Sequence, residues 1–203
     1  SQRFVTAASQ RSFNNELGVP LTLANAPDDV EAVVVEMGAR GAGHIAFLCE
    51  MARPTIGVVT TVEAVHTEVM GDLDQIARTK GELIASLPTE GLAVLNADVP
   101  LVAAMASRTR ATVMTFGERG EVRASEVRAG DDLRPSFVLH TPSGDAEVHL
   151  AVRGVHNVSN ALAAATGSTV LKAIVAVVTA VVPHAGLELR VTSLTAPEAG
   201  DDK

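Results

Sequence analysis

The chain has 203 residues, of which 47% are hydrophobic, and a formal net charge of −8 at pH 7. This size and composition indicate one globular domain with a sizeable core, and the negative charge argues against nucleic acid as a partner, because phosphate backbones are bound by clustered lysines and arginines. Cys49 is the only cysteine, which excludes an internal disulfide and a cysteine metal site and suits a reducing compartment.

Apolar runs and helical patterns alternate along the first half of the chain. Strands are predicted at residues 3–8, 30–36, 55–60, 91–95 and 111–115, and helices at 19–25, 44–52, 72–87 and 98–106. Strands that alternate with helices predict an α/β fold with a mostly parallel, doubly wound sheet and flanking helices. The pattern changes after Gly117, where residues 117–152 predict a small antiparallel β flap with a turn at PSGD.

The last fifty residues are apolar and rich in alanine. Helices are predicted at 156–166 and 169–182, a last strand at 187–194, and a disordered tail at 196–203, so residues 1–195 form one domain. Residues 161–182 resemble a membrane span in length and hydropathy. Gly167, Ser168 and Thr169 read as a turn and helix cap, however, and Lys172 follows, so two packed helices are preferred to a membrane span.

Two charged residues lie at unexpected places. VVVEMG, at 33–38, reads as a buried strand with Glu36 at its carboxyl end, where ligands bind in open α/β sheets. A carboxylate there either holds a metal ion or is an ordinary solvated strand-end residue. The helix at 72–87 has Asp72 as its predicted cap, and Lys80 lies on the apolar stripe of Leu73, Ile76, Ala77, Leu83, Ile84 and Leu87. A lysine on that stripe is unusual unless its ammonium group snorkels to the edge.

Five stretches occur in order along residues 5–166: FNNELGVPLTL (13–23), VVVEMG (33–38), TTVEAVHTEVMGDLDQIARTKGEL (60–83), LNAD (95–98) and GVHNVSNALAAAT (154–166). Together they resemble the central, ATP-binding domain of the Mur ligases of peptidoglycan synthesis, above all the branch that adds D-alanyl-D-alanine. The resemblance implies that ATP phosphorylates the terminal carboxylate of a UDP-N-acetylmuramoyl tripeptide. The amine of D-alanyl-D-alanine then attacks the acyl phosphate, with Mg²⁺ screening the charges.

The resemblance also implies roles for single residues. Glu36 and His66 match positions that bind magnesium, and Lys80 matches a lysine that the family carries as a carbamate, a charge-reversed side chain that binds the metal. Lys80 and His66 are therefore the implied catalytic residues. Near the adenine, the matching positions of the HN-x-x-N motif are His156, Asn157 and Asn160; the two asparagines also fit helix capping. The stretch that faces the UDP-sugar peptide is matched by Asn14, Asn15 and Thr22, which otherwise read as loop and cap residues.

The chain departs from the family pattern in several places. The phosphate-binding motif Gly-x-x-x-x-Gly-Lys-[Ser/Thr] is absent, because none of the three lysines follows a glycine. The strand and helix that flank this motif and the two outer domains are also missing. Thr61 and Glu63 replace an asparagine and a glycine of the family, and the arginine expected around 184–189 appears only at Arg190.

These departures predict a fragment or a truncated, degenerate ligase. We expect an unpaired position near the centre of the parallel sheet, and no amide formation from the purified chain, ATP and both substrates. Three alternatives stay open: a non-catalytic scaffold on a decayed ligase core, a Mur-type ligase for another amino acid such as a polyglutamate or cyanophycin-type enzyme, and a membrane protein. The NNELGVP stretch argues against the second. The sequence leaves the oligomeric state and the third residue of the peptide substrate open.

Overall fold

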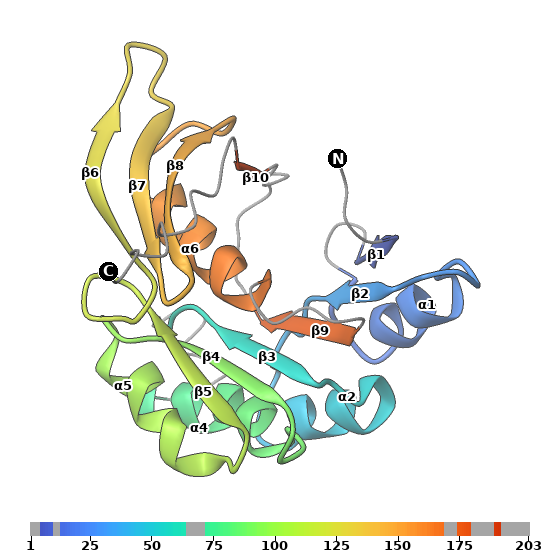
Figure 1. Ribbon diagram of the computed structural model, residues 1–203. Helices are drawn as coiled ribbons and strands as arrows, with labels where there is room; N and C mark the ends of the chain where they lie inside the picture. Colours follow the sequence, from blue (N-terminus) through green and yellow to red (C-terminus); the bar gives the residue numbers. More distant parts are fainter. Residues whose placement is uncertain (1–4, 10–12, 64–71, 169–173, 180–188, 192–203) are drawn as a thin grey trace, which may run out of the picture.

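The computed structural model describes residues 5–9, 13–63, 72–168, 174–179 and 189–191 (Figure 1). A six-stranded parallel sheet has the strand order β1-β2-β9-β3-β4-β5, and a four-stranded antiparallel sheet has the order β10-β8-β7-β6. The strands of the parallel sheet are β1 (Thr6–Ala8), β2 (Ala32–Val35), β3 (Ile56–Val59), β4 (Leu92–Asn96), β5 (Thr112–Phe116) and β9 (Ile174–Thr179). The predicted α/β class, with its parallel sheet and antiparallel flap, is confirmed.

The helices follow the predicted pattern closely up to residue 168. They are α1 (Gly18–Ala24), α2 (His44–Ala52), α4 (Leu73–Ala85), α5 (Pro100–Ala103), the 3₁₀ helix η1 (Ala104–Arg108) and α6 (Asn157–Ser168). The predicted cap of α4 is confirmed, since the Asp72 carboxylate accepts a hydrogen bond of 2.8 Å from the backbone N–H of Gln75. The helix predicted at 98–106 is instead divided into a short α-helix and a 3₁₀ turn.

Strand β9 overturns two predictions. The helix predicted at 169–182 is wrong in its described part, because residues 174–179 form a strand that pairs in parallel with both β2 and β3. The predicted unpaired position in the sheet is wrong for the same reason, since β9 fills it. The segment IVAVVT is rich in β-branched residues, which favour strands, and two neighbouring strands supply hydrogen-bond partners on both sides. The tertiary position thus overrides the local helical pattern.

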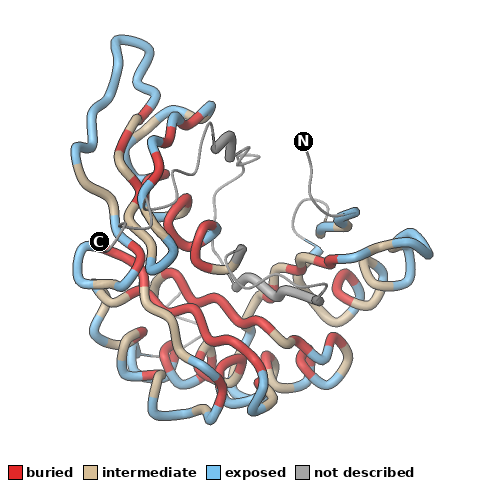
Figure 2. Tube along the Cα trace, in the orientation of Figure 1, coloured by how far each residue is buried: buried red, intermediate tan, exposed pale blue. Residues whose placement is uncertain are grey.

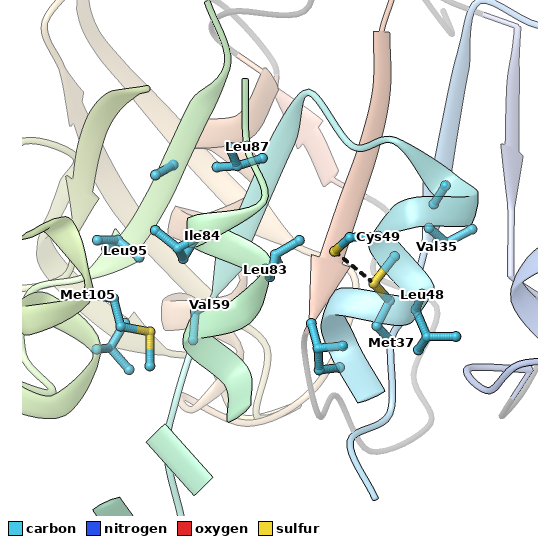
Figure 3. Packing of buried hydrophobic residues seen from close by; sticks show 14 of the residues in the cluster. Val35, Met37, Leu48, Cys49, Val59, Leu83, Ile84, Leu87, Leu95 and Met105 are labelled. Carbon is cyan, nitrogen blue, oxygen red and sulfur yellow. Dashed lines mark hydrogen bonds between the residues drawn. The ribbon is translucent and has the colours of Figure 1, made fainter. Parts of the chain in front are cut away.

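The parallel sheet has helices on both faces. Helices α1, α2, α4 and α5 cover one face, and α6 covers the other together with the flap (Figure 1). Side chains alternate accordingly: Val59 belongs to the first core, and Ile56 and Val58 belong to the second. Strands β3 and β4 are buried along their length (Figure 2). The first core is entirely aliphatic and sulfur-containing, with Leu83 and Ile84 fully buried (Figure 3).

Cys49 of α2 and Leu73 of α4 differ in how deeply they are buried. Cys49 is buried, its thiol lies 3.9 Å from the sulfur of Met37 (Figure 3), and burial raises its pKa to about 11. This protonated thiol agrees with the inert role expected for a buried cysteine. Leu73, by contrast, was wrongly assigned to the apolar stripe of α4, since 42% of it is exposed. It is the first residue of the helix, and this end of the helix does not pack fully against the core.

The flap consists of β6 (Arg123–Ala129), β7 (Pro135–Thr141) and β8 (Gly144–Leu150). Phe137, Leu139 and Val148 point inward and share a core with α6. The predicted last strand is present as β10 (Leu189–Val191), which pairs antiparallel with β8 and so belongs to the flap. The tail predicted to be disordered, 196–203, lies outside the described residues. In the described part of the chain, no helix has the length and hydropathy needed to cross a membrane.

A carboxylate of one helix holds the start of another on the first face. Glu82 of α4 accepts hydrogen bonds from the backbone N–H groups of Gly43 (2.6 Å) and Ala46 (3.1 Å), at the N-terminus of α2. Gly43, at φ 83°, has the left-handed conformation that glycine adopts easily. Glu82 therefore caps the N-terminus of α2 from a neighbouring helix. Its negative charge also interacts favourably with the positive end of the α2 helix dipole.

Replacing Glu82 by alanine is expected to lower the free energy of unfolding by about 1–2 kcal/mol, because two helix N–H groups lose their acceptor. The measurement is urea unfolding followed by far-UV circular dichroism, since the chain has no Trp or Tyr. Glu90→Ala, which removes an exposed carboxylate just beyond the same helix, is the matched control and should change stability by less than about 0.5 kcal/mol. Equal effects of the two variants would contradict the capping role.

Candidate functional site

The carboxyl ends of the parallel strands meet at one edge of the sheet, and several of the predicted site residues lie there. Glu36 directly follows β2, Thr60 and Thr61 follow β3, and Asn96 ends β4. This is the edge at which open α/β sheets bind ligands. The residues at this edge are linked by hydrogen bonds between segments that are distant in the sequence.

Glu36 is held in place by the segment before α1. Asn14 donates a hydrogen bond of 2.9 Å from Nδ2 to Glu36 Oε1, and the backbone N–H of Glu36 donates to Ser9 Oγ at 3.2 Å. The backbone N–H of Gly38 donates to the carbonyl of Asn14 at 2.7 Å, and a Cβ at Gly38 would lie 2.9 Å from the Asn14 side chain. Asn14 therefore orients a half-buried carboxylate whose other oxygen has no hydrogen-bond partner within the described residues.

Lys80 reaches the same edge from α4. Its Nζ donates a hydrogen bond of 2.8 Å to the carbonyl of Thr61, just past the end of β3. Burial lowers the pKa of Lys80, and the nearby Glu63 carboxylate opposes this change. The side chain thus lies partly inside the protein and ends at the sheet edge, as a snorkelling lysine does. A lowered pKa also increases the fraction of neutral amine, which is the form that reacts with carbon dioxide.

Two residues of the LNAD stretch organise this edge, although the sequence analysis gave them no role. The buried Asn96 donates a hydrogen bond of 2.8 Å to the carbonyl of Thr60 and accepts one of 2.9 Å from the N–H of Asp98. The Asp98 carboxylate accepts from the N–H groups of Glu118 (2.7 Å) and Arg119 (3.0 Å). In the sequence, only the LNAD motif pointed to Asn96 and Asp98, because the groups that they bind lie up to 36 residues away.

The HN-x-x-N residues form a local network at the start of α6. Asn157 is buried and donates from Nδ2 to the carbonyl of Arg153 at 2.9 Å, and the same nitrogen lies 3.1 Å from His156 Nε2. Asn160 Nδ2 donates to Asn157 Oδ1 at 3.2 Å. These contacts order the helix start. Within the described residues, no hydrogen bond joins this group to Glu36 or Lys80.

The remaining predicted site residues lie around α1. Asn15 Oδ1 accepts hydrogen bonds from the N–H groups of Leu17 (3.2 Å) and Gly18 (2.9 Å), and Thr22 Oγ1 donates to the carbonyl of Gly18 at 2.8 Å. All three hydrogen bonds are local and stabilise the helix. Thr22 also lines a cavity of about 400 Å³ between β1 and α1, whose other lining residues are Thr6, Ala7, Ala8, Phe13, Leu21 and Asn25.

The metal expected from the sequence can be compared with the donors that are present. His66 lies in 64–71, outside the described residues, so its predicted role is not tested. In the described part of the chain, no three histidine, cysteine, aspartate or glutamate side chains gather into a metal site. Magnesium, however, often binds through only one or two protein carboxylates, with waters and phosphate oxygens as its other ligands. The oriented carboxylate of Glu36 fits that requirement, whereas Lys80 fits only as a carbamate.

The chain is similar to known ligases over most of its length. The sequence model of the Mur ligase middle domain matches residues 2–167. The UDP-N-acetylmuramoyl-tripeptide–D-alanyl-D-alanine ligase of Mycobacterium tuberculosis is 46% identical over 156 residues, 76% of this chain and 31% of that protein. The ligase of the same name from Escherichia coli is 33% identical over 158 residues, 76% of this chain and 35% of that protein.

Solved structures agree with the sequence matches. A crystal structure of MurF from Acinetobacter baumannii superimposes with a TM-score of 0.77 and 29% identity, covering 82% of this chain and 36% of that one. This chain thus spans about a third of the length of the curated relatives that it matches. The match over residues 2–167 covers most of the chain, so the chain belongs to the Mur ligase family and carries its middle domain.

Proposed function

We propose that this chain is the nucleotide-binding middle part of an ATP-dependent amide ligase that adds D-alanyl-D-alanine to a UDP-N-acetylmuramoyl tripeptide. The observation that carries the proposal is the Glu36 carboxylate, which Asn14 orients at the carboxyl edge of the sheet, in a chain 46% identical to a ligase of that name. The bacterial cytoplasm is the proposed compartment. The proposed domain comprises residues 1–195.

The proposed chemistry begins with transfer of the γ-phosphoryl group of ATP to the peptide carboxylate. The resulting acyl phosphate is attacked by the amine of D-alanyl-D-alanine, phosphate leaves, and an amide forms. When bound, Mg²⁺ would neutralise charge where the phosphates and the carboxylate meet. Glu36 would hold this ion, and Asn14 would fix the carboxylate that does so. A second metal position is proposed at His66 and at Lys80 as a carbamate.

The other proposed contacts follow the family's motif positions. His156, Asn157 and Asn160 are proposed to lie near the adenine, and Asn14, Asn15 and Thr22 are proposed to face the UDP-sugar peptide. The cavity beside Thr22 gives such a ligand a recess between β1 and α1. The sequence has no Gly-x-x-x-x-Gly-Lys-[Ser/Thr] motif, and β9 occupies the centre of the sheet. We therefore propose weak nucleotide binding by this chain alone.

The test is calorimetry of Mg-ATP binding to the 203-residue chain. Because Glu36 is the proposed magnesium ligand, Glu36→Ala should weaken the binding at least about tenfold. Omitting magnesium should weaken wild-type binding to a similar extent and should have little further effect on the variant. Asn14→Ala keeps the carboxylate and releases its orientation, so a smaller loss is expected.

Glu90→Ala is the matched control for loss of one carboxylate and should bind as the wild type does. Circular dichroism of each variant checks that the fold is intact. A folded wild-type chain that does not bind Mg-ATP at millimolar concentrations would contradict the proposed site. So would a Glu36→Ala variant with unchanged affinity.

A further inference from the structure

Three polar side chains of the flap form a continuous hydrogen-bonded chain that the ligase proposal does not use. Ser125 Oγ lies 2.7 Å from His140 Nε2, and His140 Nδ1 lies 2.9 Å from Asp145 Oδ1. The three residues come from three different strands, β6, β7 and β8. The contact between Ser125 and His140 joins residues 15 apart in the chain and depends on the pairing of β6 with β7. The contact between His140 and Asp145 crosses the tight hairpin between β7 and β8.

The strand register places these side chains on one face of the flap. His140 pairs with Asp145 of β8 on one side and with Arg123 of β6 on the other. Ser125 is two residues from Arg123 and so shares its face. Leu139 points to the opposite face, into the core shared with α6. The side chain of His140 is 23% exposed and that of Asp145 is 60% exposed, so the group is open to dissolved molecules.

The hydrogen bonds define the protonation pattern of a neutral His140. An ionised aspartate only accepts hydrogen bonds, so Asp145 accepts one from Nδ1–H of His140. Nε2 then carries no proton and accepts a hydrogen bond from the Ser125 hydroxyl. This is the arrangement of a catalytic serine. The histidine removes the hydroxyl proton of the serine as its oxygen attacks a substrate, and the acid holds the imidazole ring in the required tautomer.

The backbone beside Ser125 is irregular. The β6–β7 ladder runs regularly to Ser125 and resumes at Arg128, which marks a β-bulge. Glu126, inside the bulge, has a φ of 52°, a conformation that costs energy for a residue with a side chain. Bulges redirect side chains and are frequent beside active sites. This bulge begins directly after the serine that meets His140.

We propose that Ser125 is a nucleophile that accepts acyl groups from small activated esters, with His140 as its general base and Asp145 as a positioning residue. Ser125 Oγ bonds to the ester carbonyl carbon while its proton passes to His140 Nε2. The bond between that carbon and the leaving oxygen breaks, and the departing alcohol takes the proton from His140. Water then attacks the acyl carbon while His140 Nε2 takes a proton from it. The bond between that carbon and Ser125 Oγ breaks, the carboxylic acid is released, and His140 returns the proton to Ser125 Oγ.

The test uses para-nitrophenyl acetate and the full 203-residue chain. Release of nitrophenol gives the rate, and peptide mass mapping gives the acetylated residue. We expect acetylation at Ser125, loss of this adduct in Ser125→Ala, and acetylation of Ser125 slowed at least about 100-fold in His140→Ala. Asp145→Asn should slow it at least about tenfold while leaving the circular-dichroism spectrum unchanged, because only the orientation and tautomer of His140 are disturbed.

The flap contains its own control pair. Ser136 stands opposite His149 in the β7–β8 register, and His149 Nε2 lies 3.2 Å from Glu147 Oε1, but within the described residues no hydrogen bond joins Ser136 to His149. Ser136→Ala and His149→Ala should leave the acetylation of Ser125 unchanged. Acetylation confined to lysines, the amino terminus or Ser136 would overturn the proposal. So would a folded His140→Ala chain that is acetylated at Ser125 as fast as the wild type.

Discussion

Replacing Leu83 by alanine is expected to lower the free energy of unfolding by about 3–5 kcal/mol, the range for a leucine truncated in a closely packed core. Leu83 is fully buried on the inner side of α4 (Figure 3). It packs against β3 at a position without a side chain, since a Cβ at Gly57 would lie 3.0 Å from Leu83 Cγ. Truncation therefore leaves a cavity between the helix and the sheet that the neighbouring backbones cannot fill.

Leu73 provides the control on the same helix. It has the same side chain, but 42% of it is exposed, so Leu73→Ala should cost less than about 1 kcal/mol. Urea unfolding monitored by far-UV circular dichroism measures both variants. Similar losses for the two variants would show that α4 does not pack as described. The comparison also tests the correction to the apolar stripe, which the sequence pattern extended to Leu73.

Replacing Val177 by proline is expected to cost more than about 2 kcal/mol and to make unfolding less cooperative. Val177 lies in β9, where it pairs with Val35 of β2 and Gly57 of β3. Proline has no N–H group and is excluded from central strands, because it removes a ladder hydrogen bond and leaves a buried acceptor unpaired. The loss should appear as a lower urea midpoint in circular dichroism.

Val177→Thr is the matched control, because threonine keeps the backbone N–H and the β-branched shape. If residues 174–179 formed the helix that the sequence pattern favours, proline would still be harmful. A third variant at this position separates the two structures. Val177→Ala raises helix propensity and lowers strand propensity, so it should destabilise a strand and stabilise a helix. Stabilisation by alanine would contradict the central strand β9.

The sequence predicted those parts of the fold that depend on neighbouring residues. The boundaries of α2 and the capping of α4 by Asp72 were predicted correctly, because the relevant patterns span only a few residues. The alternation of strands and helices also predicted the parallel sheet, and the change of pattern after Gly117 predicted the flap. The family was recognisable for a similar reason, since each of its motifs is a continuous stretch and their order is preserved along the chain.

The candidate site was predicted less completely. Glu36 and Lys80 were singled out from their positions at a strand end and on an apolar stripe, and the structure brings both to the carboxyl edge of the sheet. Their contacts were not predicted. The partners Asn14 and Glu36 are 22 residues apart, and nothing in either segment marks the other as its partner. The predicted metal and nucleotide roles remain predictions.

By itself, the sequence determined most of the local elements and the family, because each of these is encoded in short patterns. Only the tertiary structure decided that residues 174–179 complete the sheet, that Asn14 holds Glu36, and that Ser125, His140 and Asp145 meet on the flap. Each of these depends on contacts between different strands or segments, which form only when the chain folds. A β-branched segment becomes a strand where open hydrogen-bonding edges receive it, and a polar side chain acquires its chemistry from the partners that folding brings to it.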